Sequence, residues 1–537
     1  MNKKIFKFFS IMFFCLIMLL ITFSSIQAAG QESVFTYVLD SEDQQTADPM
    51  MTTEFYTIPM NIYDGLVRAD TIAPGQSAIV PALAESWEIS DDGLVYTFYL
   101  RKGVKFHNGE ELKADDVLFT INRMMDPQTK AKNTDFYDAI KGAKAFLNGE
   151  ADSVEGVKVI DDYTVEITLE AAYSPFIALL AAPPCAIFNR KATTEAGSDF
   201  GLIPEKTIGT GPFKLVSWTV NDQMTVEAFD DYYRGRPEVD RMIGKIIPDP
   251  ATARMLFENG EIDVFDCDFA ISQIPFFLES EKWSKQVVYG PRVGTYYYCI
   301  NQSIEPFDDI RIRKAFQHAI DRDLLLNKLY GGRGTIANAI LPRGLYGFNP
   351  NSQAIEYNPE KAKELMAEAG YPNGFEMEIA MITGSSSVKT NEVVQAMLMQ
   401  VGIKATLKQM DSAAFYGTRS EGTLPMYTSN WSADFNDPDN FIYTFFSRKN
   451  TGARSFNYDN PKVQDDIIRA REMVDPEERI ALYHEIERKI VHEDAAWLPL
   501  YTLDHYFVVQ PRVKNFKVSW NGWSGMSYYG IKIVEED

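Results

Sequence analysis

The residues that most often carry acid–base or metal chemistry are few in this sequence. The chain has five histidines, namely His107, His318, His484, His492 and His505. None of them belongs to the H-E-x-x-H arrangement of a zinc protease. His484 and His492 are eight residues apart, about two helical turns, but the helix expected there ends between them. We therefore predict packed or surface histidines and no metal site.

Motifs for nucleophilic and phosphate chemistry are also missing from the sequence. It has no G-x-S-x-G elbow and no G-x-x-x-x-G-K-[ST] loop. Gly209 and Gly211 lack the third glycine of a dinucleotide site and are followed by Pro212, which indicates a turn. Because carboxylates are abundant, no single pair stands out as a glycosidase couple. The sequence therefore predicts no catalytic residues and no cofactor.

The sequence is instead rich in side chains suited to recognition. Aromatic residues make up 13%, with 27 Tyr, 35 Phe and 7 Trp, and Tyr and Trp give large contact areas at low entropic cost. We expect most Phe side chains to fill cores, whereas the segment 430–438 places Trp431 near Asp434 in a loop ending at Asp437 and Pro438. A ring beside an anion suits an apolar ligand that carries an ammonium group. The residues alone favour a capped turn in which Asp434 bonds its own backbone.

Local patterns predict the elements that would position these residues. Trp87 and Ile89 alternate with polar residues before an Asp-Asp-Gly turn, so the segment 87–100 is expected to form a β-hairpin. The segment 114–125 is expected to be a helix. These two elements lie in the N-terminal half of the chain.

Helices and strands alternate in the C-terminal half. Asn358 before a proline is a typical helix start, and Gly370 is a typical helix end. The expected elements are a helix from 359, a strand at 376–383, a helix at 391–401, a strand at 403–407 and a helix from 476 to about 491. The β-α-β order implies parallel strands in an α/β sheet.

Length and charge limit the class of protein further. A chain of 537 residues should hold more than one domain. Its 52 basic and 75 acidic side chains give a net charge of −23. Such an excess of acid repels phosphate backbones, so we expect no nucleic-acid partner. Hydrophobic residues at 45% are typical of a globular chain rather than of a polytopic membrane protein.

The first residues are typical of a secretory signal peptide. Lys3, Lys4 and Lys7 precede an apolar run at 8–23, and small residues follow it. The run is shorter than the roughly 20 residues of a membrane-spanning helix, so we expect residues 1–29 to be removed on export. Cys15 lies inside the apolar run and lacks the small residue that a lipoprotein signal needs before it. We expect no lipid anchor.

Three cysteines remain after the predicted signal peptide. They are Cys185, Cys267 and Cys299, and no C-x-x-C pair is present. A disulfide between Cys267 and Cys299 would fit an oxidising compartment. Three buried and inert thiols are the slightly favoured alternative. An odd number leaves at least one thiol outside any internal pair.

Nine motifs in a fixed order identify a family resemblance that covers essentially the whole exported chain. They are DGL at 64–66, PALAESW at 81–87, LRKGVKFHNGE at 100–110, ADDV at 114–117, GTGPF at 209–213, GEID at 260–263, PFDDIRIRKA at 306–315, YNPEKA at 357–362 and AGYPNGF at 369–375. With these motifs the sequence resembles the extracellular solute-binding proteins of family 5, the oligopeptide and dipeptide receptors of ABC importers. The signal peptide, the acidic charge and the missing catalytic motifs agree with this resemblance.

The resemblance implies an α/β protein with the two-lobed periplasmic-binding-protein fold of class II type and an additional domain inserted in the first lobe. The implied parts are a signal peptide at 1–29, a discontinuous first lobe at 30–76, 196–290 and 505–537, an extra domain at 77–195, and a second lobe at 291–504. The chain would cross between the lobes near 290–301 and near 502–509. The three tyrosines at 296–298 would lie on a crossing strand.

The resemblance also implies a function and a binding site. The protein would be the substrate-binding component of an ABC transporter, exported to the periplasm or the cell surface, monomeric, and delivering short peptides to a membrane permease. The ligand would lie extended between closing lobes and pair its backbone with both. The implied ligand-binding residues are Thr52, Thr53, Glu54 and Phe55 in the first lobe and Asn430, Trp431, Ser432 and Asp434 in the second. Asp434 would hold the α-ammonium of the peptide.

One part of the family pattern differs in this sequence. Members that grip the carboxylate of the peptide use basic groups in the second lobe, and the equivalent residues here are Ser386 and Thr428. Lys389 and Arg419 are the nearest basic residues. Recognition of a fixed peptide length is therefore not implied. The alternatives are the same receptor role for an oligosaccharide, an opine or a nickel complex, and an exported hydrolase.

Overall fold

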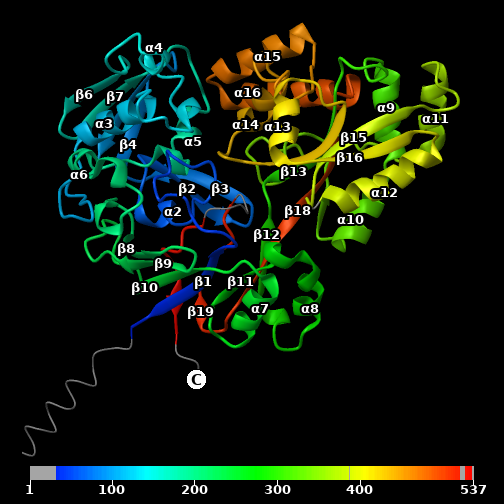
Figure 1. Cartoon of the computed structure of the whole chain (residues 1–537). Coiled ribbons are helices and arrows are strands. Elements are labelled where there is room, and N and C mark those ends of the chain that lie inside the picture. The colour runs from blue at the N-terminus through cyan, green and yellow to red at the C-terminus, as the bar shows by residue number, and fades with distance from the viewer. Residues whose placement is uncertain (1–31, 386, 521–525, 535–537) are drawn as a thin grey trace, which may run out of the picture.

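The structure, a computed structural model, describes residues 32–385, 387–520 and 526–534. The predicted signal peptide and Ser386 lie outside the described residues. Two large bodies lie side by side, and the chain passes between them through the strands labelled β12, β13 and β18 (Figure 1). The fold is therefore two-lobed, as the sequence analysis expected.

The largest sheet has twelve strands and extends through both lobes. Its main path runs β16-β15-β17-β13-β18-β11-β1-β10-β9-β8, and β12 and β14 also pair with β18. The strands are β1 (Val34–Asp40), β8 (Phe213–Thr219), β9 (Gln223–Ala228), β10 (Arg241–Ile246), β11 (Val264–Asp266), β12 (Val287–Pro291), β13 (Gly294–Ile300), β14 (Gly334–Ile336), β15 (Glu376–Ile382), β16 (Lys404–Met410), β17 (Met426–Ser432) and β18 (Trp497–Val509).

Strand β18 joins the two halves of this sheet. Its beginning pairs with β13, for example Tyr501 with Tyr296, and its end pairs with β11 and β12, for example Val508 with Val287. We call the half with β1 and β8–β12 the first lobe, and the half with β13–β17 the second lobe. The connection between β12 and β13 and the middle of β18 pass from one half to the other. They fall in the two segments expected to cross, while the residue limits of the lobes stay a prediction.

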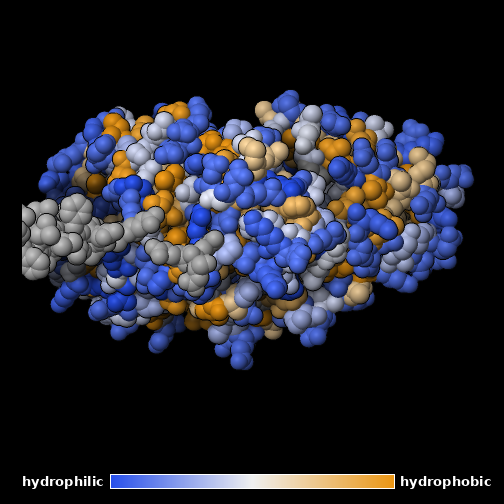
Figure 2. Space-filling model, turned by 90° about the horizontal axis from the view of Figure 1, so that it is seen from below, coloured by the Kyte–Doolittle hydropathy of each residue, from blue (hydrophilic) through white to orange (hydrophobic). Residues whose placement is uncertain are grey.

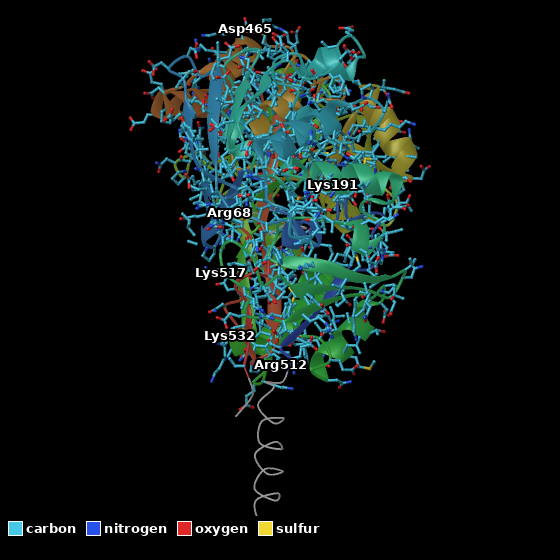
Figure 3. The ribbon with its side chains drawn as sticks, turned by 90° about the vertical axis from the view of Figure 1, so that its left-hand side faces the viewer. Arg68, Lys191, Asp465, Arg512, Lys517 and Lys532 are labelled. Carbon is cyan, nitrogen blue, oxygen red and sulfur yellow. The ribbon has the colours of Figure 1, made fainter. Side chains whose placement is uncertain are left out.

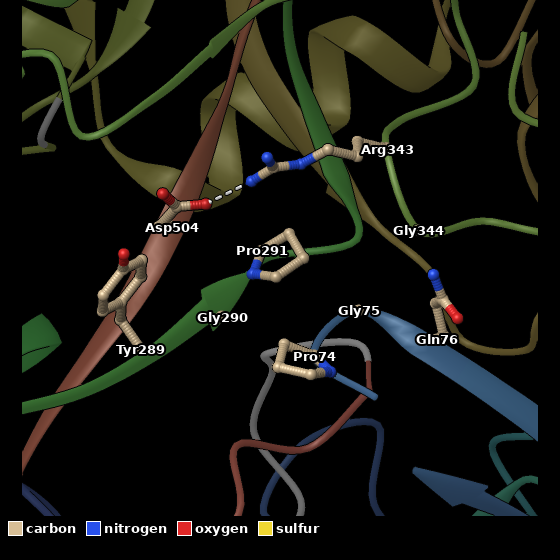
Figure 4. Close-up of a pocket in the computed structure, with 9 residues that line it drawn as sticks. All are labelled: Pro74, Gly75, Gln76, Tyr289, Gly290, Pro291, Arg343, Gly344 and Asp504. Atoms are coloured by element: carbon tan, nitrogen blue, oxygen red, sulfur yellow. Dashed lines mark hydrogen bonds and ion pairs between the residues drawn. The ribbon is translucent and has the colours of Figure 1, made fainter. Parts of the chain in front are cut away.

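A small cavity lies where the first lobe meets these crossing strands. It has a volume of about 400 Å³, and Figure 4 shows the Arg343 guanidinium bonded to Asp504 at its edge, at 2.7 Å. The turn between β2 (Val67–Ala73) and β3 (Gln76–Pro81) reaches it from the first lobe. A Cβ atom on Gly75, whose φ is +70°, would lie 2.1 Å from Pro291. Only glycine fits this close approach between the turn and the crossing strand.

A second sheet forms a small domain beside the first lobe. Its strands run in the order β4-β5-β7-β6, and all neighbours are antiparallel. The strands are β4 (Ala84–Ile89), β5 (Val95–Leu100), β6 (Val157–Asp161) and β7 (Thr164–Thr168), and the helices are α3 (Ala114–Met125), α4 (Ala143–Leu147), α5 (Phe176–Leu179) and α6 (Arg190–Ala196). The hairpin predicted at 87–100 is confirmed as β4 and β5, and α3 has the predicted bounds.

The helices of the second lobe cover its part of the large sheet (Figure 1). They are α9 (Ile310–Ala319), α10 (Arg322–Tyr330), α11 (Pro359–Glu368), α12 (Ser387–Gln400), α13 (Ser412–Ser420), α14 (Asp439–Phe446), α15 (Pro461–Glu472) and α16 (Pro476–Arg488). The Asn358 side chain accepts a hydrogen bond from the Lys361 amide, which confirms the predicted cap of α11. Strands β15 and β16 are parallel on either side of α12, which confirms the β-α-β unit.

The remaining elements are short. They are α2 (Pro59–Ile62), α7 (Pro250–Glu258), α8 (Ile274–Glu279), the hairpin β2 (Val67–Ala73) with β3 (Gln76–Pro81), and the pair β19 (Val513–Lys514) with β20 (Lys532–Ile533). α16 continues after Arg488 as a π-helical turn, Lys489–Glu493. The three cysteines Cys185, Cys267 and Cys299 are free and buried. This agrees with the slightly favoured alternative of unpaired thiols.

Candidate functional site

A cavity with a volume of about 1070 Å³ lies between the two lobes. Its walls come from the segment 53–71, the small domain, the loop after β9, strand β17 with the residues that follow it, and the C-terminal segment. Six predicted site residues line it, and they are Thr53, Glu54, Asn430, Trp431, Ser432 and Asp434. Thr52 and Phe55 lie next to the cavity and do not line it.

Strand β17 brings the second-lobe residues to the cavity. One edge of β17 pairs with β13 along its whole length, from Ser432 with Gly294 to Met426 with Ile300. Its other edge pairs with β15 only at Tyr427. Among the described residues, no strand pairs with this edge after Tyr427. An unpaired edge beside a cavity can accept an extended ligand as an additional strand.

The segment 52–56 forms a tight turn on the first-lobe side. The Thr52 hydroxyl donates to the Glu54 carbonyl at 2.6 Å and accepts from the Glu54 amide at 3.1 Å. Phe55 has φ +64°, a strained value for a residue with a side chain. The Tyr56 hydroxyl donates to the Thr52 carbonyl at 3.0 Å. Thr52 and Phe55 therefore shape the turn that presents Thr53 and Glu54 to the cavity.

Asp434 is held by a side chain of helix α14 rather than by its own turn. Its Oδ2 accepts from Asn440 Nδ2 at 3.0 Å, and its backbone amide donates to Asn440 Oδ1 at 3.0 Å. The indole Nε1 of Trp431 donates to the same Asn440 oxygen at 3.2 Å. The turn in which Asp434 bonds its own backbone is thus not the arrangement present. Asn440 fixes the ring and the carboxylate beside each other.

The surroundings of Asp434 make its carboxyl a weaker acid than usual. The side chain is accessible from the cavity but enclosed by protein, and this burial raises its pKa to about 6. The hydrogen bond from Asn440 acts in the opposite direction, and the negative charge of Asp135 raises the pKa further. A cationic ligand group would stabilise the ionised carboxylate against both its burial and the repulsion from Asp135. The site therefore suits an ammonium ion.

Trp431 is fixed on other sides as well. Its ring lies edge-on to Phe445 at 5.5 Å between centroids, and the Arg454 guanidinium lies 4.8 Å from the ring centre. Such a cation–π contact contributes about 0.5–2 kcal/mol. Phe445 itself packs in the aromatic core of the second lobe against Trp497. The ring is therefore a rigid platform at the cavity wall.

The sequence analysis missed the charged residues of the first-lobe wall. Asp64, Arg68, Arg234 and Lys517 all line the cavity. Burial raises the pKa of Asp64 to about 7, although Arg234 and Tyr232 lower it. Asp64 belongs to a motif quoted above, but nothing in its local sequence indicates that it faces a cavity.

The second lobe offers little to a carboxylate at the residues expected from the family pattern. Thr428 is buried, and its hydroxyl donates to Asn391 Oδ1. Arg419 lies 4.8 Å from the ring of Tyr416, which does line the cavity, while Arg419 and Lys389 do not. The cations that line the cavity are Arg68, Lys132, Arg234 and Lys517.

Residues of the small domain contact the second lobe. The Tyr173 hydroxyl donates to Asp439 Oδ2 at 3.0 Å, and Arg471 Nε lies 3.0 Å from Asp439 Oδ1. The Ser174 amide donates to the Arg471 carbonyl at 2.9 Å. Tyr173 and Asp439 are 266 positions apart in the sequence. These contacts connect the small domain with the second lobe.

The histidines have structural roles where their contacts are described. His107 lies between the Gly209 amide and the Gly211 carbonyl, and burial lowers its pKa to about 3. His484 Nε2 lies 2.8 Å from the Gly347 carbonyl. Both arrangements are those of packed histidines, which is the interpretation that the sequence favoured.

One group of side chains outside the cavity has the donor types of a metal site. Asp266, Asp268 and His505 lie within 4.8 Å of one another at the crossing strands. The Arg292 guanidinium is paired with Asp268, and His505 Nε2 lies 2.7 Å from Asp266 Oδ1. Because a guanidinium already neutralises part of this cluster, we interpret it as an ion-pair network that fixes the crossing strands.

An enclosed cavity between two lobes, with an aromatic platform and a carboxylate fixed at its wall, is the architecture of a ligand-capturing receptor. The family model described as bacterial extracellular solute-binding proteins, family 5 Middle, matches residues 78–453. The chain belongs to this family. Its fold class and the receptor role of the family agree with the expectations from the sequence.

Three similar proteins illustrate the range of the family. Heme-binding protein A of Haemophilus influenzae is 31% identical over 90% of this chain and 88% of its own. Di/tripeptide-binding protein 2 of Pseudomonas aeruginosa is 30% identical over 90% of this chain and 92% of its own. The periplasmic binding protein DppA from Helicobacter pylori, solved with the peptide STSA, is 28% identical with a TM-score of 0.75, covering 94% of this chain and 98% of its own.

The described residues include no helix long and apolar enough to cross a membrane. Figure 2 shows one face of the molecule, on which polar side chains surround smaller groups of apolar ones.

Proposed function

We infer that this protein is the substrate-binding component of an ABC importer and that it captures short peptides with a free amino terminus. The observation that carries this proposal is the position of Asp434 beside the unpaired edge of β17 in an enclosed cavity. A peptide backbone would pair with this edge, and its ammonium would meet the carboxylate. The di/tripeptide-binding relative and the peptide-bound neighbour support peptides as the ligand class.

The proposed binding residues are those predicted from the sequence. Asn430, Trp431 and Ser432 would offer backbone groups and a ring, and Thr53 and Glu54 would contact the ligand from the first lobe. Thr52 and Phe55 would act by shaping the turn. The proposed lobe limits remain 30–76, 196–290 and 505–537 for the first lobe, 77–195 for the extra domain and 291–504 for the second lobe.

The proposed role requires export and delivery. Residues 1–29 would direct the chain out of the cytoplasm, and the exported monomer would pass its ligand to the permease subunits of the importer. The intact mass of the exported chain checks the first point, because cleavage after Ala28 or after Ala29 removes Cys15 and gives one of two expected masses. A lipid-modified Cys15 would contradict this part of the proposal.

The test of the proposed function is a capture experiment. The purified chain is incubated with a defined mixture of dipeptides to pentapeptides, and the bound fraction and the supernatant are analysed by mass spectrometry. A receptor retains peptide up to one equivalent and forms no product. Steady consumption with new fragments would instead identify an exported hydrolase. Recovery of an oligosaccharide, an opine or a nickel complex from the purified protein would move the ligand class away from peptides.

The pKa of Asp434 leads to a prediction about pH. Since burial raises this pKa to about 6, the carboxyl is ionised above pH 6 and becomes protonated below it. We expect the affinity for a peptide ammonium to fall from pH 7.5 to pH 5, approaching about tenfold per pH unit below the pKa. Calorimetric titration across this range measures the effect. The variant Asp434→Asn should bind weakly with a flatter profile, and an unchanged slope would assign the titration to another group.

The contact between the small domain and the second lobe leads to a prediction about closure. Tyr173→Phe removes the hydroxyl that bonds Asp439 across the lobes but leaves Asp439 paired with Arg471 inside the second lobe. A hydrogen bond to a charged group contributes about 1.5–3 kcal/mol. Because ligand favours the closed form, we expect the apparent peptide affinity to fall about tenfold. Calorimetry and small-angle scattering measure affinity and closure.

The matched control for this prediction is Tyr163→Phe. The Tyr163 hydroxyl donates to Glu111 within the small domain, so its loss should leave affinity and scattering unchanged. If Tyr173→Phe binds peptide as tightly as the control and shows the same radius of gyration with ligand, the contact has no part in closure.

A further inference from the structure

Charges of both signs line each side of the cavity: Glu54, Asp64 and Asp70 accompany the first-lobe cations, and Lys132 of the small domain accompanies Asp135. On one side are Asp434 of the second lobe and Asp135 of the small domain, which is close enough to raise the pKa of Asp434. On the first-lobe side are Arg68, Arg234 and Lys517. Figure 3 shows Arg68 and Lys517 at the same edge of the first lobe. The ammonium of the proposed peptide would contact only the side of the cavity with Asp434 and Asp135.

The three first-lobe cations are not equivalent. Arg68 makes two hydrogen bonds of 2.7 Å to Asp70 and one of 2.7 Å to the Pro81 carbonyl, so its guanidinium is occupied. Arg234 and Lys517 have no carboxylate partner within 4.0 Å among the residues that the structure describes. Of the first-lobe cations, these two are therefore open to an anion that enters the cavity, and Lys132 of the small domain also lines the cavity without a described carboxylate within 4.0 Å.

Arg234 is held in place even though it has no anionic partner. Its guanidinium lies 4.6 Å from the centre of the Tyr529 ring. The hydroxyl of Tyr529, in the C-terminal segment, donates to the Arg234 carbonyl at 2.6 Å. This bond fixes the Tyr529 ring against the loop that carries Arg234. On its other side, Nη1 lies 3.5 Å from the hydroxyl of buried Tyr232. A positioned guanidinium loses little entropy when it binds a carboxylate with two parallel hydrogen bonds.

Asp64 is near enough to Arg234 for the guanidinium to lower the pKa of the carboxyl, but the two side chains form no ion pair within 4.0 Å. The Tyr232 hydroxyl lies 3.5 Å from Asp64 Oδ1, whereas Asp64 Oδ2 is buried and has no hydrogen-bond partner. Burial raises the pKa of Asp64 to about 7, so a large share of this carboxyl is protonated at neutral pH. A protonated carboxyl can donate a hydrogen bond to an anion. Asp64 thus complements an anionic ligand group beside Arg234.

We propose that Arg234 and Lys517 form an anion subsite in the first lobe that takes a carboxylate of the ligand. This proposal rests on the proposed function, because the ammonium at Asp434 defines the other end of the ligand. Such a ligand is zwitterionic and connects the lobes through opposite charges.

The test compares Arg234→Gln with the wild type for three ligands of defined charge. Trialanine has a terminal carboxylate, trialanine amide has none, and Ala-Glu-Ala amide has only a side-chain carboxylate. We expect Arg234→Gln to weaken trialanine binding about tenfold or more and to leave the amide within twofold. An equal loss for trialanine amide would overturn the subsite. A loss for Ala-Glu-Ala amide alone would support the subsite with a side chain as the source of the carboxylate.

The matched control is Arg236→Gln. Arg236 lies two residues away, does not line the cavity and pairs with Asp230 and Asp240 on the surface. The substitution Arg236→Gln removes the same charge from the same loop, and the variant should bind all three ligands as the wild type does. If both variants lose affinity equally, the effect is one of overall charge and the subsite is wrong.

Failure of the proposed function is separated from failure of the subsite by N-acetylalanine, which has a carboxylate and no ammonium. If the wild type binds no peptide, thermal stability is measured with this probe. A rise in Tm for the wild type and for Arg236→Gln, but not for Arg234→Gln, would support the subsite without the peptide assignment. The same response in all three proteins, or none in any, would overturn it.

Discussion

Asp434→Asn is expected to weaken the binding of a peptide with a free amino terminus by roughly 30-fold or more. The closed cavity removes water from the ligand ammonium, and an ammonium without a partner is costly to bury. Loss of one member of a buried charge pair costs about 2–5 kcal/mol, much of it the penalty on the partner left behind. Calorimetric titration of both proteins with trialanine measures the change in Kd.

The structure indicates that this variant will fold. Asn keeps one acceptor oxygen, which can receive the hydrogen bond that Asn440 Nδ2 now donates to Asp434 Oδ2. The backbone bond from residue 434 to Asn440 Oδ1 does not depend on the side chain. Trp431 should therefore stay in place. An unchanged unfolding temperature would separate loss of binding from loss of structure.

Two controls sharpen this prediction. N-acetylated trialanine has no ammonium, so it should bind the wild type poorly and respond less to the substitution. Glu54→Gln removes a carboxylate from the first-lobe side of the same cavity and should cost less than Asp434→Asn. If Asp434→Asn leaves Kd for trialanine within threefold, Asp434 is a structural residue held by Asn440 and the amine assignment is wrong.

Elements with local signals could be predicted well from the sequence. The hairpin of β4 and β5, helix α3 and the cap of α11 depend on residues within a few positions of one another, such as Asn358 and the Lys361 amide. Helix α12 begins at Ser387 rather than at the predicted Asn391. The serines at 385–387 are good N-cap residues, so the sequence did contain a local start signal, which the prediction did not use.

Elements that depend on distant partners could not be predicted from local patterns. Only the apolar start of β18 gave a signal, yet the strand has 13 residues and pairs with β11, β12, β13 and β14. These partners lie 160 or more positions away along the chain. The two-lobed arrangement was expected through the family resemblance, because no periodicity in one segment encodes which strands meet.

The residues of the candidate site also differ in whether the local sequence predicts them. Trp431 and Asp434 could be named as candidate site residues from the sequence because a ring and an anion occur together in one segment. Their fixation by Asn440 could not be foreseen, because a capped turn is equally compatible with the letters of the sequence. Arg234 was missed entirely, since it reaches the cavity from a loop about 200 positions before Asp434. Its local sequence is that of an ordinary charged surface turn.

The segment 430–438, which carries Trp431 and Asp434, also contains Asp437, one member of a buried ion pair with Arg479. This pair leads to the second large prediction. Arg479 of α16 donates to both oxygens of Asp437 at 2.7 and 2.8 Å, and each of the two side chains is at most 5% exposed. Arg479 Nε also donates to the Ala470 carbonyl at 2.8 Å. Asp437 Oδ1 accepts from the Asp439 amide at the start of α14, the helix that carries Asn440. The pair therefore connects the core of the second lobe to the support of Asp434.

Arg479→Met is expected to lower the free energy of unfolding of the second lobe by about 3–5 kcal/mol, because it leaves Asp437 buried without a cation. Met has a similar length and no charge, so lost packing contributes little. Urea unfolding followed by tryptophan fluorescence measures the change. Arg488→Met is the matched control, since Arg488 lies on the same helix in an exposed pair with Glu485, which contributes about 1 kcal/mol or less.

The double variant Asp437→Asn with Arg479→Met separates the pair from packing. Without the charge of Asp437 no anion is left uncompensated, so part of the lost stability should return, and the single variant Asp437→Asn completes the cycle that gives the coupling between the two residues. Peptide affinity in Arg479→Met should fall as well, because α14 would no longer hold Asn440 against Asp434. If Arg479→Met costs no more than Arg488→Met, the pair does not support the loop, and the position of Asp434 depends on Asn440 alone.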